Sequence, residues 1–192
     1  MRILGISSAT KVISIGLIDA DKVLINQTFD DIHAEKIIYY LKESGIKPEQ
    51  IEGVAVAVGP GSYSGLRGGL AAAKALADTL NVPLVAVPTL DAIAYNRIGQ
   101  DGKVAAILDA RLDEVSFAIF EIFAGQLKRL TDDQVVKIGE LDDQGAARES
   151  GHPYGVNVAK LGLLKLKAGQ KDDPLTLIPH YSHKPHFKEY NT

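Results

Sequence analysis

The chain repeats one strand pattern at a spacing of about one hundred residues. Short apolar runs separated by turns predict strands over 3–6, 12–18 and 23–28, and a similar series follows over 104–108, 115–123 and 126–130. With a shift of 102 residues, Ile6-Ser7 falls on Leu108-Asp109. The repeat predicts two lobes that each open with a three-stranded antiparallel meander, although two unrelated hairpin units could also look alike.

We therefore expect an N-terminal lobe over residues 1–98 and a smaller, degenerate C-terminal lobe over 99–192. Between the two meanders, the β-branched and alanine run at 51–58 is typical of a strand buried on both faces. Helices are expected over 32–44, over about 64–80 with Ser64 as N-cap, and from Thr89 to about residue 98. This order of elements predicts the α/β class.

Composition narrows the range of functions. The chain has 192 residues, and Lys+Arg 21 against Asp+Glu 24 give a formal net charge of -3, which offers no general attraction to nucleic acid. Cysteine is absent, so disulfides and thiolate metal sites are excluded. No apolar segment approaches the roughly 20 residues that span a bilayer, and the apolar start is too short for a signal peptide. We expect a cytoplasmic protein that has no membrane partner.

A glycine-rich segment at 59–69 follows the predicted buried strand and leads into the long helix. Such a turn exposes backbone N–H groups, and the helix dipole also favours anions there. The segment lacks the Gly-Lys-Ser/Thr ending of a P-loop, and it does not follow the first strand as a dinucleotide fingerprint does. The sequence therefore predicts an anion or nucleotide contact at Gly59, Gly61 and Ser62.

Small residues form a second face of this helix, at Gly65, Gly68, Ala72 and Ala75. Each glycine in a helix interior costs about 0.5–1 kcal/mol against alanine, so a close backbone approach should compensate. The neighbour could be the chain's own sheet or a helix of another chain, and both stay open. The helix before it carries more apolar and aromatic side chain than one buried stripe requires. We expect a partner interface made by this small face together with His33, Glu35, Ile37, Ile38, Tyr40 and Leu41.

At this point the chain resembles the TsaB family, also called YeaZ. That family carries a Gly-Pro-Gly-Ser-Phe-Thr-Gly-Leu-Arg-Ile-Gly motif, which residues 59–69 match with departures at Tyr63, Ser64 and Gly68. The family's His-Ser-Glu is matched by residues 33–35 with one change, and its Leu-Asp-Ala-Arg by residues 108–111. A late Pro-x-Tyr falls at 179–181, so the resemblance spans nearly the whole chain.

The resemblance implies a two-lobed actin-like ATPase (ASKHA, RNase H-like) fold with a reduced second lobe. It implies an accessory subunit of the machinery that makes threonylcarbamoyladenosine (t6A) in tRNA. Such a subunit would support a homologous catalytic subunit of the TsaD type, and a TsaE-type ATPase would join the complex. ATP would then enter through TsaE, tRNA would be met only through the complex, and a homodimer could compete with the TsaD pairing.

One departure bears on catalysis. The family's first turn usually begins with aspartate, whereas Ser7 stands here, and a serine offers no charge to a hard cation such as Mg²⁺. We expect no autonomous catalysis and no metal site. Two alternatives stay open: a nucleotide-dependent phosphotransferase of the same fold, and a metallopeptidase-like protein.

The other candidate groups are interpreted as structural rather than as catalytic or metal-binding. His33 and Glu35 point in different directions from a helix, so they do not share an ion easily. The histidines His180, His183 and His186 are of ligand type, but Pro185 breaks any helix that would align them. Asp109 and Arg111 could face a cleft between the lobes, although a local ion pair is the favoured interpretation.

Overall fold

A computed structural model describes residues 1–31 and 33–182 of the chain. The first five strands are β1 (Arg2–Ser7), β2 (Ile13–Asp19), β3 (Lys22–Phe29), β4 (Gly53–Ala57) and β5 (Leu84–Val87). The other five are β6 (Gly102–Asp109), β7 (Glu114–Phe123), β8 (Gln126–Arg129), β9 (Gln134–Lys137) and β10 (Ala147–Glu149). The α-helices are α1 (Ile37–Glu43), α2 (Tyr63–Leu80), α3 (Thr89–Ala94) and α4 (Gly155–Lys167). Short 3-10 helices are η1 (Ala34–Lys36), η2 (Pro48–Gln50), η3 (Tyr95–Arg97) and η4 (Ile138–Glu140).

The two sheets repeat one strand order. The first sheet runs β3-β2-β1-β4-β5, with β1, β2 and β3 antiparallel and with β4 and β5 added in parallel. The second runs β8-β7-β6-β10, where β6, β7 and β8 are antiparallel and β10 is parallel to β6. The second sheet has no counterpart of β5, and β9 pairs with the long strand β7 instead. The predicted pair of three-stranded meanders is therefore confirmed, with the second lobe the smaller.

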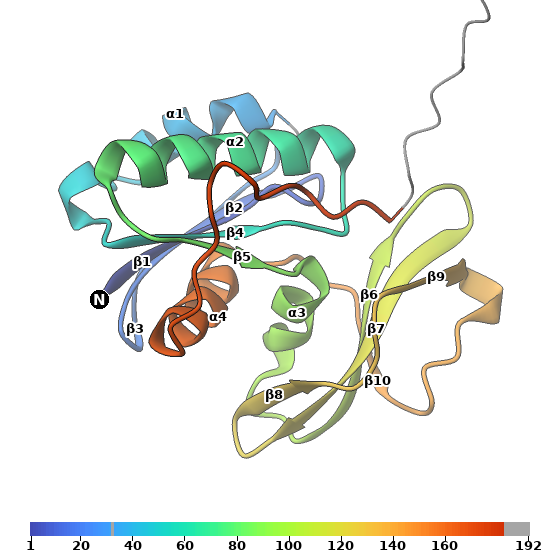
Figure 1. The fold of residues 1–192 in the computed structure, drawn as a ribbon. Coiled ribbons are helices and arrows are strands. Elements are labelled where there is room, and N and C mark those ends of the chain that lie inside the picture. The colour runs from blue at the N-terminus through green and yellow to red at the C-terminus, as the bar shows by residue number, and fades with distance from the viewer. Residues whose placement is uncertain (32, 183–192) are drawn as a thin grey trace, which may run out of the picture.

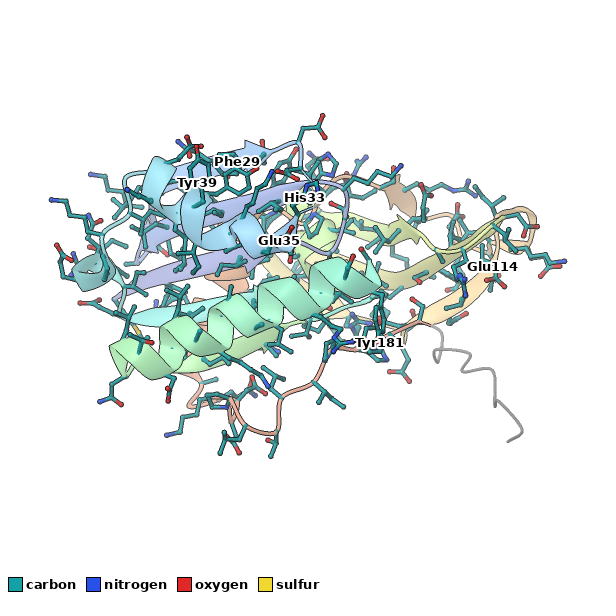
Figure 2. All side chains as sticks on the ribbon, turned by 90° about the horizontal axis from the view of Figure 1, so that it is seen from above. Phe29, His33, Glu35, Tyr39, Glu114 and Tyr181 are labelled. Atoms are coloured by element: carbon teal, nitrogen blue, oxygen red, sulfur yellow. The ribbon has the colours of Figure 1, made fainter. Side chains whose placement is uncertain are left out.

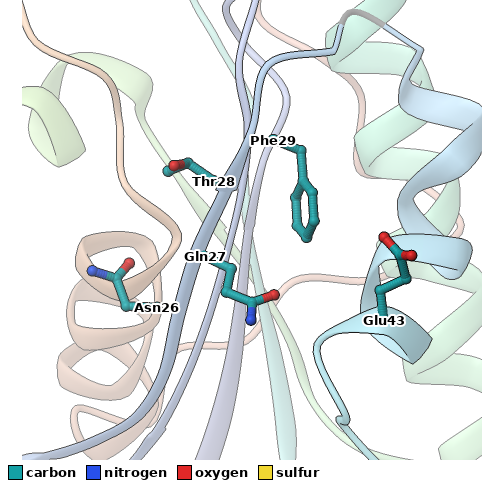
Figure 3. Close-up of a pocket in the computed structure, with 5 residues that line it drawn as sticks. All are labelled: Asn26, Gln27, Thr28, Phe29 and Glu43. Carbon is teal, nitrogen blue, oxygen red and sulfur yellow. The ribbon is translucent and has the colours of Figure 1, made fainter.

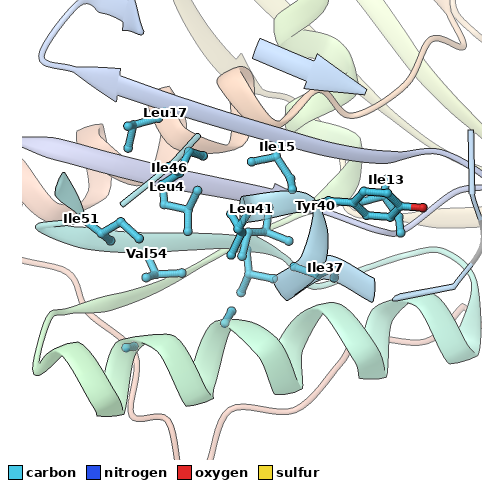
Figure 4. Close-up of a cluster of buried hydrophobic side chains, with 14 of the residues drawn as sticks. Leu4, Ile13, Ile15, Leu17, Ile37, Tyr40, Leu41, Ile46, Ile51 and Val54 are labelled. Atoms are coloured by element: carbon cyan, nitrogen blue, oxygen red, sulfur yellow. The ribbon is translucent and has the colours of Figure 1, made fainter. Parts of the chain in front are cut away.

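Helices cover both faces of the first sheet. Figure 1 shows α1 and α2 over one face and α4 against the other, while α3 lies on the second sheet. The core between the first sheet and α1 and α2 is built from aliphatic side chains (Figure 4), among them Leu4, Ile6, Ile15, Val56 and Leu70. This core exists because both faces of β1 and β4 are apolar, as the sequence of a central strand requires.

The last helix belongs to the C-terminal lobe by its place in the sequence but packs on the N-terminal lobe. α4 follows the second sheet in the chain, yet it packs on β1, β2 and β4 of the first sheet. The expected boundary at residues 98 and 99 thus separates the strands of the two sheets but leaves α4 on the N-terminal side in space. The boundary itself stays a prediction.

Three glycines let α4 lie directly on the strands. A Cβ at Gly5 would lie 2.0 Å from the carbonyl oxygen of Gly155, and one at Gly16 would lie 2.3 Å from the backbone nitrogen of Val156. The N–H of Gly155 also donates to Ser14 Oγ at 2.8 Å. The contact is therefore one of backbone against backbone, closer than any larger residue permits.

The structure changes the start of the first predicted helix and the cap of the second, while the third begins at Thr89 as expected. The first helix begins at Ile37 after the 3-10 turn η1, later than expected, and Ile32 lies outside the described residues. Ser62, not Ser64, caps α2, because its Oγ accepts the N–H of Gly65 at 3.3 Å. Pro88 precedes α3, and the hydroxyl of Thr89 instead accepts the N–H of Gly59 at 3.1 Å.

No helix in the described part of the chain is both long enough and apolar enough to cross a membrane.

The close packing of α4 predicts a sharp stability difference between two alanine substitutions. Gly16→Ala should lower the free energy of unfolding by about 1–3 kcal/mol, because the new methyl group has no space beside Val156. The matched control is Gly139→Ala in η4, where an added Cβ meets no atom within 4 Å, and it should change stability by less than about 0.5 kcal/mol. Urea denaturation of the two variants measures both values, and equal stabilities would contradict the packing.

Candidate functional site

A cleft of about 1140 Å³ lies between the two lobes. Its walls come from the turn after β1, the start of α2, the end of β6, the loop before α4 and the C-terminal segment. The polar side chains that line it are Thr10, Lys11, Ser62, Tyr63, Ser64, Asp109, Arg111, Ser116, Ser150, His152, Tyr181 and Ser182. Cationic side chains outnumber the single carboxylate of Asp109, which suits an anionic ligand.

The glycine-rich turn contributes two of its three predicted contacts to this cleft. Gly61 and Ser62 line it, and the N–H of Ser62 is already used in a bond to Ala9 O at 2.8 Å. Gly59 lies under the C-terminal segment instead, since a Cβ there would come within 1.9 Å of the carbonyl oxygen of His180. Its φ of +124° is a conformation that glycine adopts without strain.

Asp109 and Arg111 both face the cleft. The local ion pair favoured from the sequence is not formed, as no ion pair between them occurs in residues 1–31 and 33–182. Their charges are consequently available to a ligand in the cleft.

Ser7 ends β1 as Asp109 ends β6, at matching places of the repeated meander. Ser7 is fully buried, and its hydroxyl has no hydrogen-bond partner among the described residues. Within that same part of the chain, no three His, Asp or Glu side chains are placed to hold one metal ion. The first lobe therefore presents a neutral hydroxyl where the second presents a carboxylate.

The predicted partner surface divides into buried and exposed residues. Ile37, Tyr40 and Leu41 belong to the core of the first lobe, with exposed fractions of 0%, 8% and 6%. Ile38 is 51% exposed, and its neighbour Tyr39 is 55% exposed. These two side chains form the apolar part of the outer surface of α1. The interface itself stays a prediction.

His33 and Glu35 are exposed at η1, on the side of the first sheet that α1 and α2 cover (Figure 2). On α2, Ala75 is exposed and Ala72 is half-buried. Together with Ile38 and Tyr39, they define the helical face of the first lobe that is open to solvent.

The glycines of α2 are explained inside the chain. A Cβ at Gly65 would lie 2.0 Å from the carbonyl oxygen of Ser8, and one at Gly68 would lie 2.4 Å from Ala34 Cβ. The close neighbours of this small face are thus the turn after β1 and η1, and the cost of these glycines in a helix is offset by intramolecular packing.

Asp31 holds the start of this helical region in place. Its carboxylate accepts the hydroxyl of Tyr40, the ammonium of Lys36 at 2.9 Å and the backbone N–H of His33 at 2.8 Å. Donation by Tyr40, followed by that of Lys36, keeps the pKa of Asp31 well below its usual range. The same bond, with burial second, raises the pKa of Tyr40 to about 12.

A second, shallower hollow of about 540 Å³ lies between β3 and α1 (Figure 3). It is lined by Asn26, Gln27, Thr28, Phe29 and Glu43, and it includes none of the predicted site residues. The ring of Phe29 stacks on Tyr40 with centroids 4.0 Å apart, so this wall belongs to the core rather than to a ligand site.

The two similar sheets with a cleft between them define a two-lobed α/β protein, as the sequence repeat predicted, of the actin-like fold that the family resemblance implied. The structure superposes on YeaZ from Pseudomonas aeruginosa with a TM-score of 0.81 at 20% identity, covering 94% of this chain and 99% of that one. A second Pseudomonas aeruginosa structure, described as an uncharacterized protein with similarity to peptidase YeaZ, gives 0.82 at 20% identity over 95% and 99%.

The chain belongs to the family described as TsaD: tRNA N6-adenosine threonylcarbamoyltransferase, whose family model matches residues 31–173. Among its relatives are proteins named tRNA threonylcarbamoyladenosine biosynthesis protein TsaB. The one from Bacillus subtilis is 30% identical over 146 residues, covering 73% of this chain and 64% of the relative. The one from Escherichia coli is 32% identical over 130 residues, covering 63% and 55%. The match thus spans little more than half the length of these curated relatives.

Two functional features escaped the sequence analysis. Tyr39 was passed over in favour of Tyr40, because spacing alone does not tell which of two adjacent tyrosines faces the core. The contacts of residues 180–182 with both lobes have no local sequence signal. His180 is 65% exposed and lies 3.7 Å from Asp133, while the predicted tail histidines His183 and His186 lie outside the described residues.

The Asp31 cluster predicts a pH-dependent contribution to stability. Since its pKa is lower in the folded chain than the unfolded value of about 3.9, the contribution is present above that value and is lost as the pH falls through the folded pKa. Asp31→Asn should therefore lower the midpoint of thermal unfolding at pH 6, with a difference from wild type that shrinks below about pH 4. Asp30→Asn, at the exposed neighbour, is the control. A difference that is constant with pH would contradict this role.

Proposed function

We propose that this chain is an accessory subunit in the synthesis of threonylcarbamoyladenosine in tRNA. The observation that carries the proposal is the match of nearly the whole fold to YeaZ, combined with the TsaD family match over residues 31–173. In this role the chain binds and supports a homologous catalytic subunit of the TsaD type. Pairing of two related subunits is favoured by related folds, since each side can present the same helical layer.

The helical face of the first lobe supports this pairing. Ile38 and Tyr39 are large side chains that are half-exposed on α1, and among residues 1–31 and 33–182 Figure 1 shows no helix or strand stacked outside α1 and α2. Tyrosine is enriched at protein interfaces, because its ring packs while its hydroxyl stays solvated. Tyr39 follows this pattern, with its hydroxyl donating to Glu43 at 2.6 Å. A homodimer through the same face would compete with the catalytic subunit.

The cleft supports a role without chemistry of its own. A phosphoryl-transfer site needs hard anionic ligands for its metal ion, and Ser7 offers none at the end of β1. We assign to Gly61, Ser62 and Arg111 at most the binding of an anion. ATP then enters the reaction through a TsaE-type ATPase that joins the complex, and tRNA is met through the complex as a whole.

The pairing predicts the effect of a charge on the helical face. Ile38→Glu should abolish association with the TsaD-type subunit encoded in the same genome, because complex formation would bury an unpaired carboxylate. The fold should persist, since the side chain at this position already reaches solvent. Sedimentation velocity of the mixed subunits measures association, and circular dichroism checks the fold.

The matched control is Phe123→Glu, which puts the same charge on a 72% exposed aromatic residue of the second sheet. It should leave association unchanged. Undiminished binding by the folded Ile38→Glu variant would reject this face as the interface, while equal losses in both variants would show that charge anywhere on the surface is harmful.

A further inference from the structure

The segment after α4 returns along the first lobe and ends in the wall of the interlobe cleft. Figure 1 shows it passing beside β5 and α2 towards the second sheet, and Figure 2 places Tyr181 at the end of α2 nearest that sheet. Tyr181 and Ser182 belong to the cleft wall. Residues 179–182, here called the strap, therefore form one side of the cleft.

The strap is bound to the first lobe at two points. The N–H of His180 donates to the carbonyl of Val58 at 2.7 Å, just beyond the end of β4. The ring of Tyr181 stacks on Tyr63 at the start of α2, with centroids 4.8 Å apart. Arg67 extends this stack, since its guanidinium lies 5.3 Å from the centre of the Tyr63 ring and donates to the Tyr63 hydroxyl at 2.9 Å.

Two residues of the strap also contact the second lobe. Ser182 Oγ lies 2.7 Å from Ser116 Oγ on β7. His180 Nδ1 lies 3.7 Å from Asp133 Oδ2, and Arg129 donates to the other oxygen of that carboxylate, Oδ1, at 2.5 Å. Ser116 is only 2% exposed although it lines the cleft, and the strap supplies the partner of its hydroxyl.

We propose that the strap is a latch that joins the two lobes and closes this side of the cleft, and that its release opens the cleft to a ligand. Its polar contacts are one backbone hydrogen bond, one hydroxyl pair and the 3.7 Å approach of His180 to Asp133. Its other contacts are the ring stack, the packing of Tyr181 on a buried cluster of the first lobe and that of His180 on Gly59, and none of its residues is fully buried. Contacts of this kind open locally at far lower cost than the sheets unfold. The latch thus provides a conformational device that is independent of the proposed function.

Because the chain contains no cysteine, introduced cysteine pairs can be tested for disulfide formation without interference from native thiols. In the full-length chain, Ser116→Cys combined with Ser182→Cys should form a disulfide under mild oxidation, because the two hydroxyl oxygens are already in contact. The control pair is Thr79→Cys with Ser182→Cys. Thr79 is exposed and lies 16 residues beyond Tyr63 on α2, about 24 Å along the helix at 1.5 Å per residue, so this pair should not crosslink. Failure of the first pair to crosslink would overturn the latch.

A second test measures opening. The single variant Ser116→Cys should react slowly with the thiol reagent DTNB, and adding Tyr181→Ala should speed the reaction about ten-fold or more, because local opening exposes the thiol. Ser44, the C-cap residue of α1, is only 9% exposed. The variant Ser44→Cys therefore reports on the rest of the fold, and its rate of reaction with DTNB should not change when Tyr181→Ala is added. An unchanged rate at residue 116 would overturn the proposal, and so would an equal acceleration at residue 44.

Discussion

The backbone of α4 rests directly on the backbone of β1 and β2, and the relation of the two lobes depends on this contact. Gly5, Gly16 and Gly155 leave no side chain between helix and strand, and the N–H of Gly155 is bound to Ser14. α4 follows the last strand of the second sheet in the chain, and it packs on the first sheet. This contact joins the end of the second lobe to the strands at the start of the chain. The two lobes are therefore held in a defined relative position, which sets the width of the cleft, and they do not move freely about a flexible linker.

This arrangement leaves the first lobe with two different faces. α4 covers one face of the first sheet, and α1 and α2 cover the other, where their outer surface meets solvent. The glycines of α2 serve the internal packing, because Ser8 and Ala34 occupy the space beside Gly65 and Gly68. In the proposed pairing, contact with the partner falls to side chains that project outward, of which Ile38 and Tyr39 are the largest on α1.

Much of the fold could be predicted because the local pattern of apolar residues determines each strand. The alternating runs of the two meanders and the unbroken apolar run of β4 each fix a strand by their own period, and their repetition predicted the two similar sheets. The placement of α4 on the first sheet could not be predicted, since it depends on a match between glycines about 140 residues apart in the chain.

The site was predicted less fully for the same reason. The turn at Gly61 and Ser62 carries a local signature, and both residues line the cleft. Gly59 was assigned to the anion contact, but a return of the chain from His180 covers it. A strand-end residue such as Ser7 can be located from sequence, whereas its full burial, with no hydrogen-bond partner among the described residues, is a property of the folded structure.

The central claim is that this chain works by pairing its helical face with a related subunit. Hydrogen exchange of the backbone amides, measured by mass spectrometry on the chain alone and in an equimolar mixture with the TsaD-type subunit of the same genome, tests it most directly. Pairing through the helical face should slow exchange in the mixture over η1, α1 and the outward side of α2, with β8 and β9 unchanged. Protection confined to β8 and β9, or no protection anywhere while both proteins are folded, would contradict it.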